Sequence, residues 1–246
     1  MKSEPVSRQD IHPHSVWRLI LLHLLPGTLI LVLFVLAVPV VKSLSLPVRF
    51  ATLLCIYLVL IPFELGVLLI EGKKRNGKYS LQGIVLLREK IPVWQYFLFV
   101  PLLVAWSAAL ALLLSPVADF LVRTVFYWLP VYFIDSDISG YSRTTLIIMV
   151  TLYGIGNVGA AIVEELYFRG YLMPRLSRLK GWAPLVNTVL FSLQHFLTPW
   201  QYLFIILGVL PQAYLVNKKR NIYLGIIAHS LLNLLSAILL ILSVFG

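Results

Sequence analysis

Two adjacent glutamates and an arginine lie near the end of a long apolar stretch. The segment AAIVEELYFRG contains Glu164, Glu165 and Arg169. In a helix, side chains four residues apart share a face, so Glu165 and Arg169 can form an ion pair. Glu164 is rotated by about 100° from Glu165, and Arg169 therefore serves it poorly. The spacing predicts one structural ion pair and one glutamate that faces something else, although a purely structural role is the alternative.

Two histidines and an asparagine occur in later apolar segments. FSLQH places Phe191 four residues before His195, and HSLLN places His229 and Asn233 one helical turn apart. Helix rise puts Glu164 and both histidines about 13–20 Å from the basic or aromatic residues that end their helices. We therefore expect these polar groups to meet in one cavity, where they hydrogen-bond to one another. A histidine at such a position can instead serve only as a contact between helices.

The composition is that of a membrane protein. Of 246 residues, 60% are hydrophobic and 12% are charged, against about 45–50% and about 25% in soluble domains. Ionisable residues inside membrane spans are rare and usually functional. The net charge of +10 comes from basic loops between apolar segments, so no nucleic-acid partner is expected. The single cysteine, Cys55, excludes a disulfide framework.

The fold expected is all-α, a polytopic transmembrane helical bundle of about seven spans, with six to eight possible. We treat residues 1–246 as a single membrane-embedded domain, with the catalytic core at 145–245. The aromatic loop 115–144 predicts an amphipathic helix at the membrane surface, and an extra span at 117–134 is the alternative. The predicted spans are 17–41, 50–70, 93–114, 145–172, 183–197, 201–216 and 222–245.

Lysine and arginine alternate between the two sides of the predicted bundle. Sixteen of the twenty lie in the N-terminus and in the segments 71–90, 169–182 and 217–221. The positive-inside rule then puts the N-terminus in the cytoplasm and the C-terminus outside. The first span, at 17–41, is too long for a signal-peptide core and is expected to be retained. Small size and compact loops favour a prokaryotic plasma membrane.

Other polar residues in the apolar segments carry weaker signals. Glu64 has no partner at helical spacing, which favours a structural role. Asn157 lies seven residues before Glu164 and is expected to support the site or to join helices. The histidines of the N-terminal region, His12, His14 and His23, are expected to lie near the membrane surface without a special role.

The ordered motifs EELYFR, FSLQH and HSLLN resemble the CPBP family, which comprises CAAX-type prenyl proteases and bacteriocin-processing (Abi) enzymes. The resemblance covers about residues 164–233 and implies peptide-bond hydrolysis within the membrane. It implies that Glu164 and His195 activate water, and that His229 and Asn233 hold the oxyanion. Glu165, Arg169 and Phe191 would then be supporting residues. No motif residue departs from the family pattern.

The cofactor and the function class have alternatives. One glutamate and two histidines also suit zinc, but the sequence lacks H-E-x-x-H, so we expect no cofactor. A metal-dependent protease using the same residues is the alternative. A catalytically silent scaffold, immunity or secretion-partner protein, and a transporter or proton channel, are further possibilities. The expected partners are the lipid bilayer and a membrane-associated peptide or protein substrate. CAAX-like processing, pheromone or bacteriocin maturation, and sorting-signal cleavage remain open for that substrate.

Overall fold

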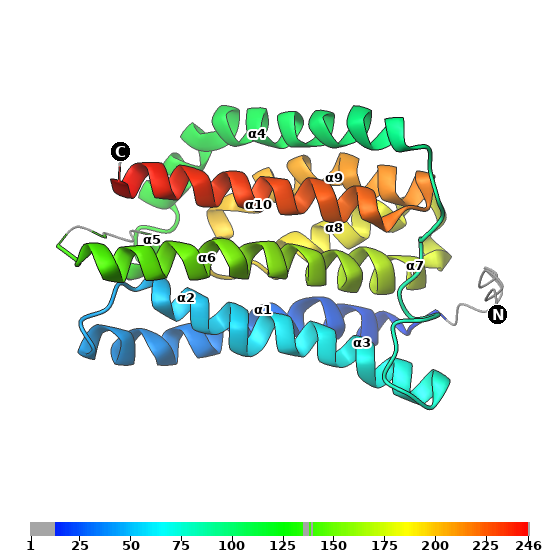
Figure 1. Ribbon diagram of the computed structural model, residues 1–246, viewed down its shortest axis with the longest axis horizontal. Coiled ribbons are helices and arrows are strands. Elements are labelled where there is room, and N and C mark those ends of the chain that lie inside the picture. Colours follow the sequence, from blue (N-terminus) through cyan, green and yellow to red (C-terminus); the bar gives the residue numbers. More distant parts are fainter. Residues whose placement is uncertain (1–12, 135–137, 139, 246) are drawn as a thin grey trace.

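The computed structural model describes residues 13–134, 138 and 140–245, which contain α-, π- and 3-10 helices and no β-strand. The helices pack side by side as a bundle (Figure 1). Six helical stretches are long and apolar enough to cross a membrane, which confirms the predicted polytopic bundle. The elements are α1 (Val16–Ser43), α2 (Arg49–Cys55), η2 (Ile56–Leu60), α3 (Ile61–Asn76), α4 (Val93–Thr124), α5 (Val131–Ile134), α6 (Arg143–Glu164), η3 (Glu165–Leu172), α7 (Met173–Arg175), η4 (Ser177–Trp182), α8 (Ala183–Leu193), η5 (Pro199–Gln201), α9 (Tyr202–Lys219) and α10 (Ile222–Phe245).

The predicted span 183–197 is shorter in the structure. Helix α8 has 11 residues, about 16 Å at the usual rise, and it is too short to count among the six long stretches. It pairs with α9 as a hairpin inside the bundle (Figure 1). The chain leaves the helix before His195, which therefore lies in a turn rather than on a helical face. Its backbone N–H donates to the Ser192 carbonyl at 3.0 Å.

The aromatic loop 115–144 covers the tip of this hairpin. Helix α4 continues to Thr124, so the predicted span 93–114 is too short and no separate span occupies 117–134. The following residues pack inward, with the ring of Phe126 6.1 Å from that of Trp200. Phe133 lies 5.3 Å from Phe34 of α1. Between Thr124 and Arg143, the described residues form only one short helix, α5, and aromatic side chains there find partners within the bundle.

Three of the basic segments gather at one end of the bundle. The Leu86 N–H donates to the Gly170 carbonyl at 2.8 Å, and the Glu89 N–H donates to the Arg220 carbonyl at 2.9 Å. These bonds join the segments 71–90, 169–182 and 217–221. The positive-inside rule predicts that these segments lie on the same side of the bundle, and they do. Their cytoplasmic location stays a prediction. Lys2 and Arg8, which the sequence assigns to the same side, lie outside the described residues.

Helix α1 crosses the end of α8 in close contact. A Cβ atom on Gly27 would lie 1.9 Å from the backbone carbonyl oxygen of Gln194. Gly27 itself is buried, and Gln194 directly precedes His195. Close backbone approach at small residues is a common way for membrane helices to pack. This crossing therefore fixes the position, along the bundle axis, at which the chain leaves α8.

We predict that Gly27→Ala destabilises the protein, because a methyl group cannot fit against a backbone carbonyl without moving one of the two segments. A cost of about 1–3 kcal/mol is expected, seen as a lower melting temperature in detergent. Gly66→Ala is the matched control, since a Cβ on Gly66 meets nothing within 4 Å. Equal melting temperatures for the two variants would contradict this packing.

Candidate active site

The predicted ion pair is present and fully buried. Arg169 Nη1 lies 3.4 Å from Glu165 Oε1, and both side chains are 0% exposed. The Arg169 guanidinium also lies over the Phe191 ring, 3.9 Å from its centroid. This cation–π contact lets Phe191 hold the arginine in place. The predicted pairing of Glu165 with Arg169 is confirmed, and Phe191 joins them.

The segment that carries the pair is a π-helix rather than an α-helix. Residues Glu165–Leu172 form η3, so the rotation of 100° per residue expected from the sequence does not hold along it. The Met173 N–H bonds to the Phe168 carbonyl, five residues back. That carbonyl also accepts from Asn187 Nδ2 at 3.0 Å. Turns of π-helix are uncommon and occur often at functional sites, and here neighbouring elements stabilise one.

The basic end of the bundle supports the same turn. The Gly170 carbonyl accepts from Leu86 at 2.8 Å, and Arg175 Nη1 donates to the Tyr171 carbonyl at 2.6 Å. A Cβ on Gly170 would lie 2.6 Å from Val85 Cγ1. Gly170 thus permits the loop to approach the π-helix closely enough for these bonds. The segment 71–90, for which the sequence indicated only a basic charge, therefore helps to shape the site.

His229 lies between the two glutamates. Its Nδ1 is 3.1 Å from Glu165 Oε1, and its Nε2 is 3.8 Å from Glu164 Oε2. Because Nδ1 is engaged by Glu165, any hydrogen bond from His229 to another molecule must come from Nε2. Glu164 has no other ionic partner within 4 Å among the described residues. Helices α6 and α10 thus bring the first and third motifs into contact.

Gln212 of α9 is a contact that the sequence analysis missed. Its Nε2 donates to Glu165 Oε1 at 2.9 Å, and the side chain is buried. Glu165 Oε1 therefore faces Arg169, Gln212 and His229 at once. On the other side, a Cβ on Gly225 would lie 2.4 Å from Glu165 Oε2. The signal for Gln212 in the sequence is a single amide within a long apolar segment.

His195 reaches the same cluster from the turn after α8. Its Nδ1 is 2.8 Å from the Phe191 carbonyl oxygen. A carbonyl only accepts, so Nδ1 carries the proton and, in the neutral ring, Nε2 carries the lone pair. The Phe191 ring lies 4.9 Å from the ring of His195 and 6.3 Å from that of His229. Phe191 therefore joins the second motif to the other two.

Asn233 is held by the backbone of α6. Its Nδ2 donates to the Asn157 carbonyl oxygen at 2.9 Å, which leaves one amide hydrogen for another acceptor. The sequence placed Asn157 near the site through its side chain, whereas the contact uses its main chain. Asn233 follows His229 by one turn on α10, so both side chains project toward α6. His229 and Glu164 lie in the cluster, Phe191 connects His195 to it, and Asn233 reaches it through α10.

Two other buried polar residues differ from their expected surroundings. Glu64 on α3 is 0% exposed, and within the described part of the chain neither carboxylate oxygen has a hydrogen-bond partner. His23 is also 0% exposed, so its side chain is enclosed within the bundle, while its position near the membrane surface stays a prediction. Its Nδ1 donates to the Leu19 carbonyl at 2.7 Å, and its Nε2 accepts from Asn187 Nδ2 at 3.0 Å. Asn187 therefore joins α1, α8 and the π-helix.

Within the described residues, the cluster does not have the arrangement of a metal site. No group of three or more His, Cys, Asp or Glu side chains is arranged to hold a metal ion over residues 13–134, 138 and 140–245. Glu165 Oε1 is already surrounded by an arginine, an amide and an imidazole. The arrangement observed is that of a hydrogen-bonded charge network, and independence from a metal stays a prediction.

One comparison with known proteins matches this part of the chain. The family model described as type II CAAX prenyl endopeptidase Rce1-like matches residues 142–235. The matched segment includes all three motifs, which confirms the resemblance to the CPBP family. No curated protein and no solved structure matched the chain. The six apolar stretches support an integral, multi-pass membrane protein, and residues 142–235 of it are similar to this endopeptidase family.

We predict that Arg169→Met lowers stability strongly, because it leaves the buried Glu165 without its cation. Breaking a buried pair costs about 3–5 kcal/mol, measured as a lower melting temperature in detergent. The double variant Glu165→Gln/Arg169→Met removes both charges and is expected to recover much of the loss. If the double variant melts below Arg169→Met, the buried pair is not the source of the effect.

Proposed function

We propose that this protein, whose residues 142–235 match the type II CAAX prenyl endopeptidase Rce1-like family, hydrolyses a peptide bond of a membrane-associated peptide or protein. The observation that carries the proposal is the different environment of the two adjacent glutamates. Glu165 is enclosed by Arg169, Gln212 and His229. Among basic side chains of the described structure, Glu164 has only the His229 imidazole within 4 Å.

In this proposal, Glu164 and His195 activate the attacking water. A carboxylate without a paired arginine can accept a proton, and His195 Nε2 carries a lone pair because Nδ1 donates to Phe191. The water oxygen bonds to the peptide carbonyl carbon while its proton passes to Glu164, and His195 Nε2 accepts a hydrogen bond from the same water. The C–N bond then breaks, and the proton is delivered to the leaving amine. Water's remaining hydrogen stays with the new carboxyl group.

The oxyanion of the tetrahedral intermediate is assigned to Asn233 and His229. Asn233 retains one amide hydrogen after bonding to Asn157, and it is positioned by a backbone carbonyl. A protonated His229 Nε2 is the second donor, since Nδ1 faces Glu165. Removing one such donor typically lowers the rate by about 10²–10³-fold. Glu165 and Arg169 act indirectly, by orienting the His229 ring.

The substrate class beyond a membrane-associated peptide is left open. Prenylated C-terminal peptides, peptide pheromones or bacteriocins, and C-terminal sorting signals all present a peptide bond at the membrane surface. Mass spectrometry of membrane peptides, with and without the active protein, distinguishes among them. A cytoplasmic N-terminus and an external C-terminus are part of the same proposal, as is reaction without a metal.

We predict that Glu164→Gln abolishes peptide cleavage while the melting temperature in detergent stays close to that of the native protein. The amide keeps the shape of the side chain but cannot accept a proton from water. Glu71→Gln, which alters a more exposed carboxylate paired with Arg18, is the matched control and is expected to retain activity. Near-native turnover by Glu164→Gln would overturn its assignment as the base.

His195→Ala and Asn233→Ala are predicted to differ in the pH dependence of the residual rate. A histidine that accepts a hydrogen bond from the attacking water must be neutral, so it contributes a fall in rate as the pH decreases and it becomes protonated. His195→Ala should lack this contribution on the acidic side. Asn233→Ala should lower the rate at every pH and keep the native profile. Identical profiles for the two variants would contradict the division of roles, as measured from initial rates on one peptide.

A further inference from the structure

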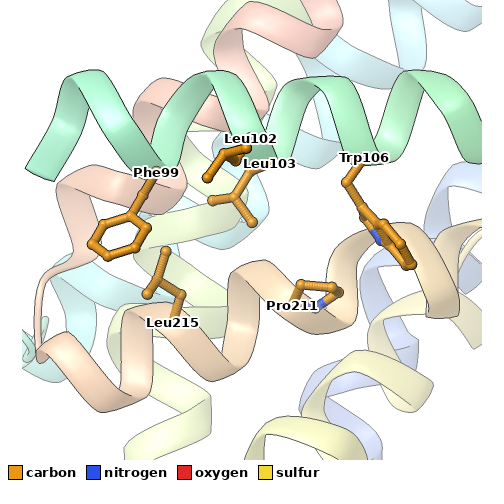
Figure 2. A pocket seen from close by; sticks show the side chains of 6 residues that line it. All are labelled: Phe99, Leu102, Leu103, Trp106, Pro211 and Leu215. Carbon is orange, nitrogen blue, oxygen red and sulfur yellow. The ribbon is translucent and has the colours of Figure 1, made fainter.

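An apolar groove lies between α4 and α9 (Figure 2), and no residue of the glutamate cluster lines it. Its volume is about 310 Å³. Leu102 and Trp106 in its wall are 59% and 48% exposed, and both helices are long enough to span the membrane, so the groove opens toward lipid. The side chains that line it are Phe99, Leu102, Leu103, Trp106, Pro211 and Leu215.

Specific hydrogen bonds build the end of this groove at Trp106. Pro211 has no backbone N–H, so the Leu207 carbonyl four residues earlier lacks its usual helical partner. Trp106 Nε1 donates to that carbonyl at 3.0 Å. Ser107 Oγ donates to the neighbouring Gly208 carbonyl at 3.1 Å. These bonds tie α4 to α9 beside Pro211, while Phe99 and Leu215 hold the helices apart farther along (Figure 2).

The other end of the groove lies next to a lysine. Lys219 Nζ lies over the Phe99 ring, 5.1 Å from its centroid. Lys219 is the last residue of α9, at the end of the bundle where the basic segments meet. Its neighbour Arg220 forms an ion pair with Glu89, whereas Lys219 has no salt bridge to any residue that the structure describes. The groove therefore has a cation at its mouth and hydrocarbon along its length.

The dimensions fit a single chain in one leaflet. From Phe99 to Trp106 the helix rises about 10 Å, which is less than the roughly 15 Å of hydrocarbon in half a bilayer. An amphiphile whose negative group lies at the basic end would place its chain along this path. A zwitterionic headgroup would bring its own cation near Lys219, and an uncharged one would leave the lysine unpaired. Charge and shape together favour an anionic lipid.

We propose that this groove binds one acyl chain of an anionic bilayer phospholipid, with the phosphate held at Lys219. The lipid would bridge α4 and α9 next to Gln212, the residue that follows Pro211 and donates to Glu165. Binding would therefore stabilise the helix that supports the glutamate cluster. The proposal does not depend on proteolytic activity, because it concerns the outer surface of the bundle.

The test is native mass spectrometry of the purified protein in an uncharged detergent, titrated with phosphatidylglycerol or phosphatidylcholine of the same chain length. The native protein should bind one phosphatidylglycerol more tightly than phosphatidylcholine. Leu102→Trp should abolish this binding by filling the groove. Lys219→Gln should weaken it about fivefold, and Lys219→Arg should retain it. Bound phosphatidylglycerol should also raise the melting temperature of the native protein.

Matched controls separate the groove from general lipid adhesion. Leu112→Trp alters an α4 residue that is 78% exposed and is not among those lining the groove, and Lys180→Gln removes another lysine near the basic end. Both should bind phosphatidylglycerol like the native protein. Equal affinity for the two lipids, or equal losses in the controls, would overturn the proposal. Displacement of phosphatidylglycerol by a prenylated peptide at matched concentration would assign the groove to a substrate lipid and overturn it as well.

Discussion

The neutralisation of Glu165 within the bundle is the interaction on which the site depends. A carboxylate that is removed from water needs an opposite charge and hydrogen bonds, because an unpaired buried charge is strongly unfavourable. Arg169 supplies the charge, while Gln212 and His229 supply polar contacts from α9 and α10. The positions of three segments are therefore coupled to one oxygen atom. Glu164, next in sequence, is left with His229 as its ionic neighbour.

The π-helix beside this pair explains how many elements can meet there. A widened turn does not form the regular α-helical hydrogen bonds, so its carbonyl groups can accept from outside the helix. The Phe168 carbonyl accepts from Asn187, and the Gly170 carbonyl accepts from Leu86. Asn187 also contacts His23 of α1. The backbone of one irregular turn thus connects the first helix, the short hairpin and the basic loop.

The short helix α8 has a comparable effect on the second motif. Because the helix ends at Leu193, His195 lies in a turn. The contact between Gln194 and Gly27 sets the position of this turn along the bundle axis. Its ring is oriented by the Phe191 carbonyl, and the Phe191 ring in turn lies under Arg169. The orientation of His195 is therefore linked to the same ion pair. The α4–α9 groove is lined by Pro211, the residue before Gln212 on α9.

The sequence by itself determined the membrane-spanning class, the approximate positions of most helices, and the pairing of Glu165 with Arg169. Each of these depends on composition or on spacing along one segment, which the chain displays directly. It also predicted that three motifs meet, through similar depths on separate helices. Those inferences required no knowledge of which helices are neighbours.

Only the tertiary structure decided which partners complete these local patterns. Gln212, Asn187 and the main chain of Asn157 act across helix interfaces, and nothing in their local sequence identifies the acceptor. The π-helix, the early end of α8 and the burial of His23 likewise depend on bonds and close approaches between distant segments. A local sequence pattern specifies the helix face on which a residue lies and its depth in the membrane. The neighbour across that face is specified by packing, because hydrogen bonds and steric contacts between helices join residues far apart in the chain.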